Sequence, residues 1–226
     1  MNFDLIFFDL DATLYPESNG LWPAIRERID LYMRQQMGFD PAEIARLRED
    51  YYLNHGTTLC GLRKFHQVDP VDYLNFVHDL PVHRYLHPDP ALRTMLLSMP
   101  QRRWVFTNSD SPHANRVMQA LGITDCFEGM IDVLRLEPDC KPNLPAYQKA
   151  LHLVGDPDPS RCALLDDSTR NLATAKDLGI YTVLVGHNGD HPDADHCPAD
   201  NCPADRCLTD IHALPTVVPE FWDSKP

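Results

Sequence analysis

The chain has 226 residues, 43% of them hydrophobic, which is enough for one large domain or for a core with a smaller inserted domain. Its formal charge of −13 at pH 7, from 33 acidic and 20 basic residues, argues against binding to a nucleic acid polymer through its phosphates. No apolar run approaches the roughly 18–20 residues of a membrane span, and Asp4, Asp9 and Asp11 interrupt the apolar start, which argues against a secretory signal. We therefore expect a soluble, cytoplasmic protein without a membrane partner.

The first elements expected along the chain are one buried strand and then helices only. Residues 4–8 are apolar enough to form a buried strand. From residue 21 to residue 33 an apolar side chain recurs every four positions, as on one face of a helix. Asp40-Pro41 and Asp69-Pro70 each read as a helix N-cap followed by proline at the first helical position. Residues 17–88 are therefore expected to form an all-helical block.

After residue 88 the pattern changes to strands that alternate with helices. Strands are expected at 103–108, 130–134, 162–167 and 181–186, and helices at 91–99, 112–121, 146–154 and 169–178. This alternation implies right-handed crossovers and a parallel sheet. We predict the α/β class, with a three-layer, Rossmann-like parallel sheet core built from residues 1–16 and 89–187. Residues 17–88 are then an all-helical cap domain inserted after the first strand.

Residues 188–226 show little periodicity and are rich in proline and aspartate, so we expect an irregular tail whose apolar stretch ALPTVVPEFW docks on the core. Cys197, Cys202 and Cys207 in this tail are candidate zinc ligands, but they lack the CxxC pairs of most zinc ribbons. We expect an irregular loop with free thiols, with a disulfide or an opportunistic metal site as the alternatives. The four other cysteines stand singly along the chain, as expected of reduced thiols in a cytosolic protein.

Polar side chains follow the expected strands where each strand ends. The first strand is followed by Asp9 and Asp11, the second by Thr107 and Asn108, the third by Lys141, and the fourth by Asp166 and Asp167. These side chains should meet, because open parallel sheets bind ligands outside the carboxyl ends of their strands. Clustered carboxylates demand a hard cation, and few carboxylates with open water positions suit Mg²⁺. A lysine and a threonine beside them would hold phosphate oxygens.

Four motifs carry a resemblance to the haloacid dehalogenase-like superfamily: DLDAT (9–13), VFTNS (105–109), CKP (140–142) and LLDDS (164–168). The resemblance implies that Asp9 is a nucleophile that forms an aspartyl phosphate, and that Asp11 is the general acid and then the general base. A second aspartate at this position implies an oxygen leaving group, hence a phosphatase or a phosphomutase.

The same resemblance implies a set of metal and phosphate ligands. Mg²⁺ would bind Asp9, the backbone carbonyl of Asp11, and Asp167, with Asp166 acting through water or as a further ligand. Thr107 and Lys141 would hold the phosphoryl oxygens, and Lys141 would also offset the charge of Asp9.

Longer stretches, at 51–62, 86–100, 105–129 and 140–151, are similar to the pyrimidine 5'-nucleotidase family within this superfamily. This implies a helical cap and, as the partner, a small-molecule phosphomonoester of the nucleoside 5'-monophosphate kind, such as UMP or CMP. The alternatives are a phosphatase of another small ester such as a sugar phosphate or phosphoglycolate, a phosphomutase, and a binding or regulatory protein on the same scaffold.

Several further residues have two interpretations. We expect Asn108 to contact the phosphate or a residue that holds it. The cap loop with His55, Gly56 and Thr58 would meet the base or ribose of a nucleotide, or would simply connect two helices. For His113 and Arg116, on the helix after the second strand, a solvated or paired side chain is the favoured interpretation.

Overall fold

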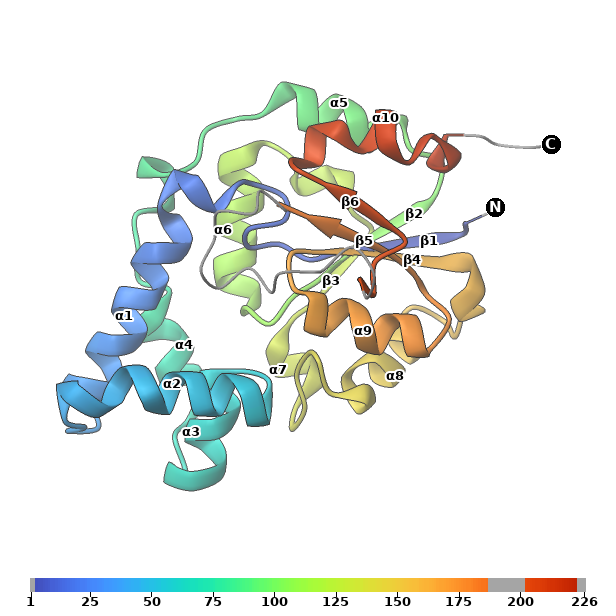
Figure 1. Cartoon of the computed structure of the whole chain (residues 1–226). Helices are drawn as coiled ribbons and strands as arrows, with labels where there is room; N and C mark the ends of the chain where they lie inside the picture. Colours follow the sequence, from blue (N-terminus) through green and yellow to red (C-terminus); the bar gives the residue numbers. More distant parts are fainter. Residues whose placement is uncertain (1–2, 187–201, 223–226) are drawn as a thin grey trace.

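The computed structural model describes residues 3–186 and 202–222, and its centre is a parallel sheet (Figure 1). The strands are β1 (Leu5–Phe8), β2 (Arg102–Phe106), β3 (Gly129–Ile131), β4 (Cys162–Asp166), β5 (Tyr181–Val185) and β6 (Arg206–Leu208). They lie in the order β3-β2-β1-β4-β5-β6, and every neighbouring pair is parallel. The order reverses between β1 and β4, and open α/β sheets bind ligands at such a switch point.

Helices cover both faces of the sheet, so the predicted three-layer α/β core is confirmed (Figure 1). One face carries α5 (Pro90–Ser98), α6 (Ser111–Leu121) and α10 (Leu214–Val217); the other carries α7 (Val133–Leu136), α8 (Leu144–Leu153) and α9 (Thr169–Asp177). Strand β1 shows why both faces are apolar. Ile6 and Phe8 join the core cluster under the first set of helices, and Leu5 and Phe7 join the cluster under the second.

Between β1 and β2 the chain forms a body made of helices only, which we call the helical insertion (residues 17–88). It contains α1 (Leu21–Gln35), α2 (Pro41–His55), α3 (Thr58–His66) and α4 (Pro70–Val77), which lie beside the sheet in Figure 1. As expected, Asp40 and Asp69 cap α2 and α4 by accepting hydrogen bonds from backbone N–H groups two residues on, at 2.9 and 2.8 Å. The domain boundaries at residues 16/17 and 88/89 stay predictions.

The strand expected at 130–134 is longer than the strand that the structure has there. Strand β3 ends at Ile131, because Asp132 accepts a 2.9 Å hydrogen bond from the backbone N–H of Arg135 and so caps the short helix α7. Apolar residues at 133, 134 and 136 belong to that helix rather than to the strand.

The description of residues 188–226 as irregular was wrong for two segments that the structure describes. Residues 214–217 form the short helix α10, and residues 206–208 form the edge strand β6, with Arg206 opposite Val183. Asp205 fixes the start of this strand by accepting hydrogen bonds from the backbone N–H and the hydroxyl of Thr182 in β5. The apolar end of the tail packs on the core, since Leu214, Val218 and Phe221 are fully buried.

The cysteines of the tail are only partly covered by the structure. Cys197 lies outside the described residues, so a metal site in the tail stays a prediction. Cys202 is disulfide-bonded, so the expectation of free thiols in the tail was wrong for this residue. Cys207 carries a free thiol with its Sγ 3.9 Å from the Sγ of Cys202. No helix within the described ranges is long and apolar enough to cross a membrane.

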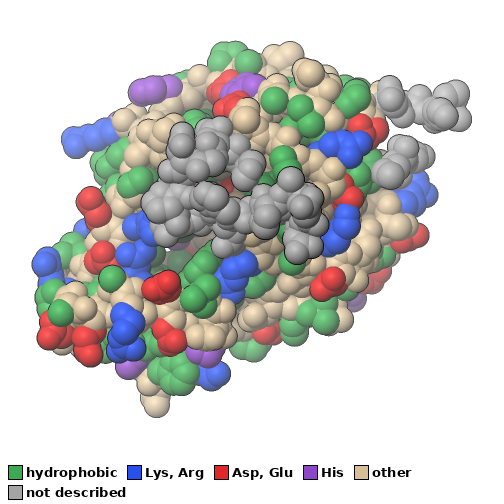
Figure 2. Space-filling view, viewed as in Figure 1, with side chains coloured by type: hydrophobic (Ala, Val, Ile, Leu, Met, Phe, Trp, Pro, Cys, Tyr) green, Lys and Arg blue, Asp and Glu red, His purple; other side chains and the backbone are tan. Residues whose placement is uncertain are grey.

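Charged side chains of both signs are interspersed over the helical insertion on the face seen in Figure 2. On this face the basic side chains do not gather into one surface, in keeping with the acidic composition of the chain.

Candidate active site

A buried lysine joins the ends of β1 and β4. Nζ of Lys141 donates hydrogen bonds to Oδ1 of Asp9 at 2.8 Å and to Oδ2 of Asp166 at 2.6 Å. Lys141 is only 1% exposed, and both carboxylates are buried. Burial opposes the charged form of the lysine, but the two carboxylates more than offset this and raise the pKa of Lys141. The amine is therefore an ammonium ion held between two carboxylates.

Asn108, the residue after Thr107, holds the loop that carries Lys141. The side-chain amide of Asn108 donates to the carbonyl of Lys141 at 3.0 Å and accepts from its backbone N–H at 2.9 Å. Asn108 thus holds the peptide of Lys141, while its direct contact with a phosphate stays a prediction. Thr107 is buried, and its hydroxyl oxygen accepts a 3.0 Å hydrogen bond from the backbone N–H of Ser109. The phosphate contact of Thr107 also stays a prediction.

Three carboxylates form the cluster expected to hold a cation. Asp9, Asp166 and Asp167 each offer an oxygen, and the three oxygens lie within 4.8 Å of one another. Burial raises the pKa of Asp9 to about 7, with Asp166 adding to the effect and Lys141 opposing it. Burial and the two neighbouring carboxylates also raise the pKa of Asp167 well above its ordinary value. Hard oxygen donors of this number fit Mg²⁺, which would relieve their mutual repulsion.

The carboxylate of Asp11 is not one of the three clustered carboxylates, and it has hydrogen-bond partners of its own. Oδ1 accepts from the hydroxyl of Tyr15 at 2.6 Å and from Nε2 of His113 at 2.9 Å, and Oδ2 accepts from the hydroxyl of Ser109. Burial opposes ionisation of Asp11, but His113 and the hydroxyl donors more than offset it and lower the pKa of the carboxyl. The predicted role of the Asp11 backbone carbonyl as a metal ligand stays a prediction.

His113 contacts Asp11, a partner that the sequence did not identify. It is fully buried, so the expectation of a paired side chain is confirmed and the solvated alternative is wrong. It is the third residue of α6, whose N-cap is Asp110, and α6 follows the carboxyl end of β2. The one signal in the sequence was this position, since the first turn after a strand of an α/β sheet lies at the ligand-binding edge.

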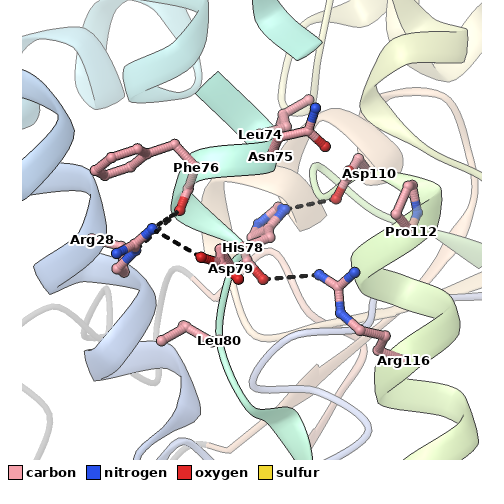
Figure 3. Close-up of a pocket in the computed structure, with 10 residues that line it drawn as sticks. All are labelled: Arg28, Leu74, Asn75, Phe76, His78, Asp79, Leu80, Asp110, Pro112 and Arg116. Atoms are coloured by element: carbon pink, nitrogen blue, oxygen red, sulfur yellow. Dashed lines mark hydrogen bonds and ion pairs between the residues drawn. The ribbon is translucent and has the colours of Figure 1, made fainter. Parts of the chain in front are cut away.

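A second histidine, His78, links the helical insertion to the core next to this pair, and Figure 3 shows its contacts with Asp110 and Arg116. His78, at the end of α4, stacks on His113 with ring centroids 4.2 Å apart, and its Nδ1 lies 2.6 Å from Oδ1 of Asp110. Arg116 of α6 donates to the carbonyl of His78 at 2.8 Å, so its side chain is paired as expected. A cavity of about 590 Å³ opens beside these residues, and its lining includes neither Asp9 nor Lys141.

The short connection between α2, which ends at His55, and α3 lies against the Lys141 loop at Gly56. A Cβ at Gly56 would come within 2.8 Å of the Sγ of Cys140 and 2.9 Å of the carbonyl oxygen of Lys141, so only glycine allows this approach. His55 lines a second cavity, of about 640 Å³, and Thr58 is the first residue of α3. Their predicted contacts with a nucleotide stay predictions.

This fold and this site define a hydrolase of one family: the chain belongs to the haloacid dehalogenase-like hydrolases, whose family model matches residues 3–179. It is 32% identical over 194 residues to Phosphate metabolism protein 8 of Saccharomyces cerevisiae, covering 80% of this chain and 60% of the relative. The chain thus spans about three fifths of the length of that relative.

Solved structures show the same fold at low identity. A HAD phosphatase from Thermococcus onnurineus superimposes with a TM-score of 0.61 and 16% identity, covering 94% of this chain and 96% of that one. The putative HAD-hydrolase YfnB from Bacillus subtilis, whose structure is bound to magnesium, gives a TM-score of 0.61 and 12% identity, covering 96% and 98%. The family model confirms the predicted superfamily, and these structures confirm the fold.

Proposed function

We propose that the chain is a Mg²⁺-dependent phosphomonoesterase whose preferred substrates are nucleoside 5'-monophosphates, UMP and CMP first. The observation that carries the proposal is the pairing of Lys141 with Asp9 beside a separately held Asp11. One carboxylate is positioned to attack and the other to move a proton. A binding protein on the same scaffold would have no need for either.

Asp9 is held in one orientation by both of its oxygens. Lys141 donates to Oδ1 at 2.8 Å, and the hydroxyl of Thr13 donates to Oδ2 at 3.3 Å. A carboxylate fixed in this way has lost most of the orientational freedom that an attack on phosphorus must restrict. The Asp9 oxygen forms a bond to phosphorus while the ester oxygen leaves, which gives an aspartyl phosphate. The ammonium group of Lys141 offsets the negative charge that this step brings together.

Asp11 and His113 together manage the proton. The 2.9 Å hydrogen bond between Nε2 of His113 and Oδ1 of Asp11 is the path by which His113 passes a proton to Asp11. Asp11 gives that proton to the leaving oxygen as the bond between phosphorus and the ester oxygen breaks. In the second step the Asp11 carboxylate takes a proton from the water that attacks the aspartyl phosphate.

Mg²⁺ is the cation that the carboxylate cluster fits. Asp9, Asp166 and Asp167 would hold it, together with the carbonyl of Asp11. When bound, the ion supplies positive charge that offsets repulsion between the phosphate and the carboxylates. The magnesium in the structure of YfnB supports this assignment.

Support for the substrate class comes from relatives and from the sequence. The yeast relative is named for phosphate metabolism, and one structural neighbour is called a phosphatase. The nucleotide assignment rests on the stretches that resemble pyrimidine 5'-nucleotidases. The cytoplasmic location is proposed from the sequence, in which four cysteines stand singly along the chain.

The test is phosphate release from a panel of esters with Mg²⁺ and with EDTA. The panel contains UMP, CMP, AMP, GMP, sugar phosphates, phosphoglycolate and an aryl phosphate, and it compares wild type with Asp9→Asn. Asp50→Asn, on the exposed side of α2, is the matched control. Mg²⁺-dependent release that is strongest on UMP and CMP and is lost only in Asp9→Asn supports the proposal. Release that favours another ester overturns the nucleotide assignment. The absence of release from every ester overturns the proposal that the chain is a phosphatase.

A further inference from the structure

Two free thiols from distant parts of the chain meet beside Lys141. Cys60 lies in α3 of the helical insertion, and Cys140 directly precedes Lys141 in the core. Their Sγ atoms share a hydrogen bond and are 2.8 Å apart, less than an ångström longer than the ~2.05 Å of a disulfide bond. We propose that Cys60 and Cys140 form a reversible redox pair, whose disulfide ties the helical insertion to the loop that carries Lys141.

The two thiols differ in how solutes reach them. Cys60 is partly exposed and lines the cavity of about 640 Å³, together with the basic residues Arg63 and Lys64. Cys140 is fully buried behind it. A small oxidant therefore meets Cys60 first, and Cys140 is placed to react with the product.

The electrostatic surroundings assign the same roles. The hydrogen bond with Cys140 lowers the pKa of Cys60 to about 7 against the effect of burial, with help from Thr57 and Arg63. The same hydrogen bond, together with burial, raises the pKa of Cys140. The thiolate is the reactive form of cysteine, so the lowered pKa of Cys60 agrees with its place on the cavity as the thiol that meets the oxidant first.

With hydrogen peroxide as oxidant, the reaction balances in two steps. The Cys60 thiolate attacks one peroxide oxygen, the O–O bond breaks, and hydroxide leaves, so that Cys60 becomes a sulfenic acid. Cys140 then loses its proton and attacks the sulfur of Cys60, the S–O bond breaks, and water leaves. Two thiols and one peroxide thus give one disulfide and two waters. An added dithiol reverses the change by thiol–disulfide exchange.

The disulfide would make an existing noncovalent contact covalent. Arg63 of the insertion pairs with Glu137 of the core at 3.2 Å, and Arg170 of α9 donates to the carbonyls of Tyr52 and Leu53 in α2. These contacts can open, whereas a disulfide cannot. If the proposed phosphatase admits substrate by movement of the insertion, the oxidised form is inactive. This consequence for turnover rests on the proposed function, while the thiol pair itself does not.

Cys162 provides an internal control. It is fully buried, its Sγ donates to the carbonyl of Asp158, and burial raises its pKa to about 12. A buried thiol with a raised pKa is expected to resist peroxide.

The experiment treats the full chain with hydrogen peroxide, denatures it in N-ethylmaleimide, and maps the thiols by peptide mass spectrometry. We expect a linked Cys60–Cys140 peptide pair that dithiothreitol separates, while Cys162 is labelled. Cys140→Ser is expected to stop at a Cys60 sulfenic acid, which dimedone traps. Labelling of Cys60 and Cys140 to the same extent as Cys162 after peroxide would overturn the redox pair.

Phosphate release is measured on the same samples. The residual activity of wild type should equal the fraction of chain that is still reduced, and Cys60→Ser should keep its activity in peroxide. A linked pair with unchanged activity would overturn the effect on turnover. If the reduced enzyme releases no phosphate from any ester, the proposed function fails, and the peptide measurement still decides the thiol pair.

Discussion

Replacing Lys141 with methionine would remove the ammonium group that lies between Asp9 and Asp166. Methionine has a similar length, so the change leaves little cavity and acts mainly on charge. Lys141 is 1% exposed and donates to both carboxylates at 2.8 and 2.6 Å, so water does not replace the lost partner. Two buried carboxylates would then face each other without a counter-ion.

The expected cost follows from the burial of all three groups. Breaking a buried ion pair by removing one partner costs about 3–5 kcal/mol of unfolding free energy. With an unfolding entropy of ~2.1 cal/mol/K per residue, a chain of 226 residues loses roughly 0.5 kcal/mol per degree near its Tm. Lys141→Met should therefore lower Tm by about 6–10 °C in EDTA.

The cost should also depend on pH. Without the lysine, the pKa of Asp9, already raised to about 7 by burial, rises further. A carboxyl whose pKa is raised by folding destabilises the protein progressively as pH rises from the unfolded pKa, ~3.9, to the folded pKa. Lys141→Met should thus lose more stability at pH 8 than at pH 6.

Thermal unfolding in EDTA at both pH values is the assay. Lys64→Met, an exposed lysine on α3, is the matched control and should change Tm by no more than about 1 °C. Adding Asp9→Asn to Lys141→Met should recover part of the loss, because one of the unpaired charges is gone. A Tm for Lys141→Met within a degree of wild type would refute the view that the lysine neutralises the two carboxylates.

Three further predictions concern other parts of the molecule. His113→Asn keeps a donor but not the imidazole, so kcat should fall at least ~100-fold with little change in KM, measured by steady-state phosphate release; an unchanged kcat would remove His113 from proton transfer. The rate at which iodoacetamide alkylates Cys60 should rise with pH as the thiolate forms, with a midpoint near pH 7. Cys140→Ala should move that midpoint to higher pH. Identical rate profiles in the two proteins would show that Cys140 does not lower the pKa of Cys60. Burial lowers the pKa of His212, but hydrogen bonds and charge from Asp210 and Asp89 more than offset this and raise it. The contacts of protonated His212 with these two carboxylates therefore stabilise the fold below pH ~6.5, and this stabilisation is lost as pH rises through the folded pKa. Asp89→Asn, which can still cap α5, should therefore cost more stability at pH 5.5 than at pH 8, by less than ~1 kcal/mol at this exposed site; an equal cost at both pH values in urea unfolding would contradict the assignment.

The parallel sheet and the carboxylate cluster could be predicted because their signals are local. An apolar strand followed at once by acidic residues occurs at Asp9 and again at Asp166 and Asp167. Because parallel strands have their carboxyl ends at one edge of the sheet, these residues are predicted to lie close together even when no side-chain contact is known.

The pairings across the fold could not be predicted, because they depend on how separate elements dock. His113 reaches Asp11 from 102 residues away, and Cys60 reaches Cys140 from 80 residues away. The local pattern of apolar and polar residues does not indicate either contact. Strand β6 was missed for a different reason: it is a three-residue edge strand with two exposed positions, so it shows no alternating apolar pattern.

The most direct test of the central claim is to trap the phosphorylated nucleophile. The best ester from the panel, labelled at its phosphate, is mixed with wild type, Asp9→Asn and Asp11→Asn, quenched in acid within milliseconds, and the label is mapped to peptides. The account predicts label on Asp9 in wild type, label that decays more slowly in Asp11→Asn because water is no longer activated, and none in Asp9→Asn. Phosphate release by wild type with no labelled Asp9 in either wild type or Asp11→Asn would contradict it.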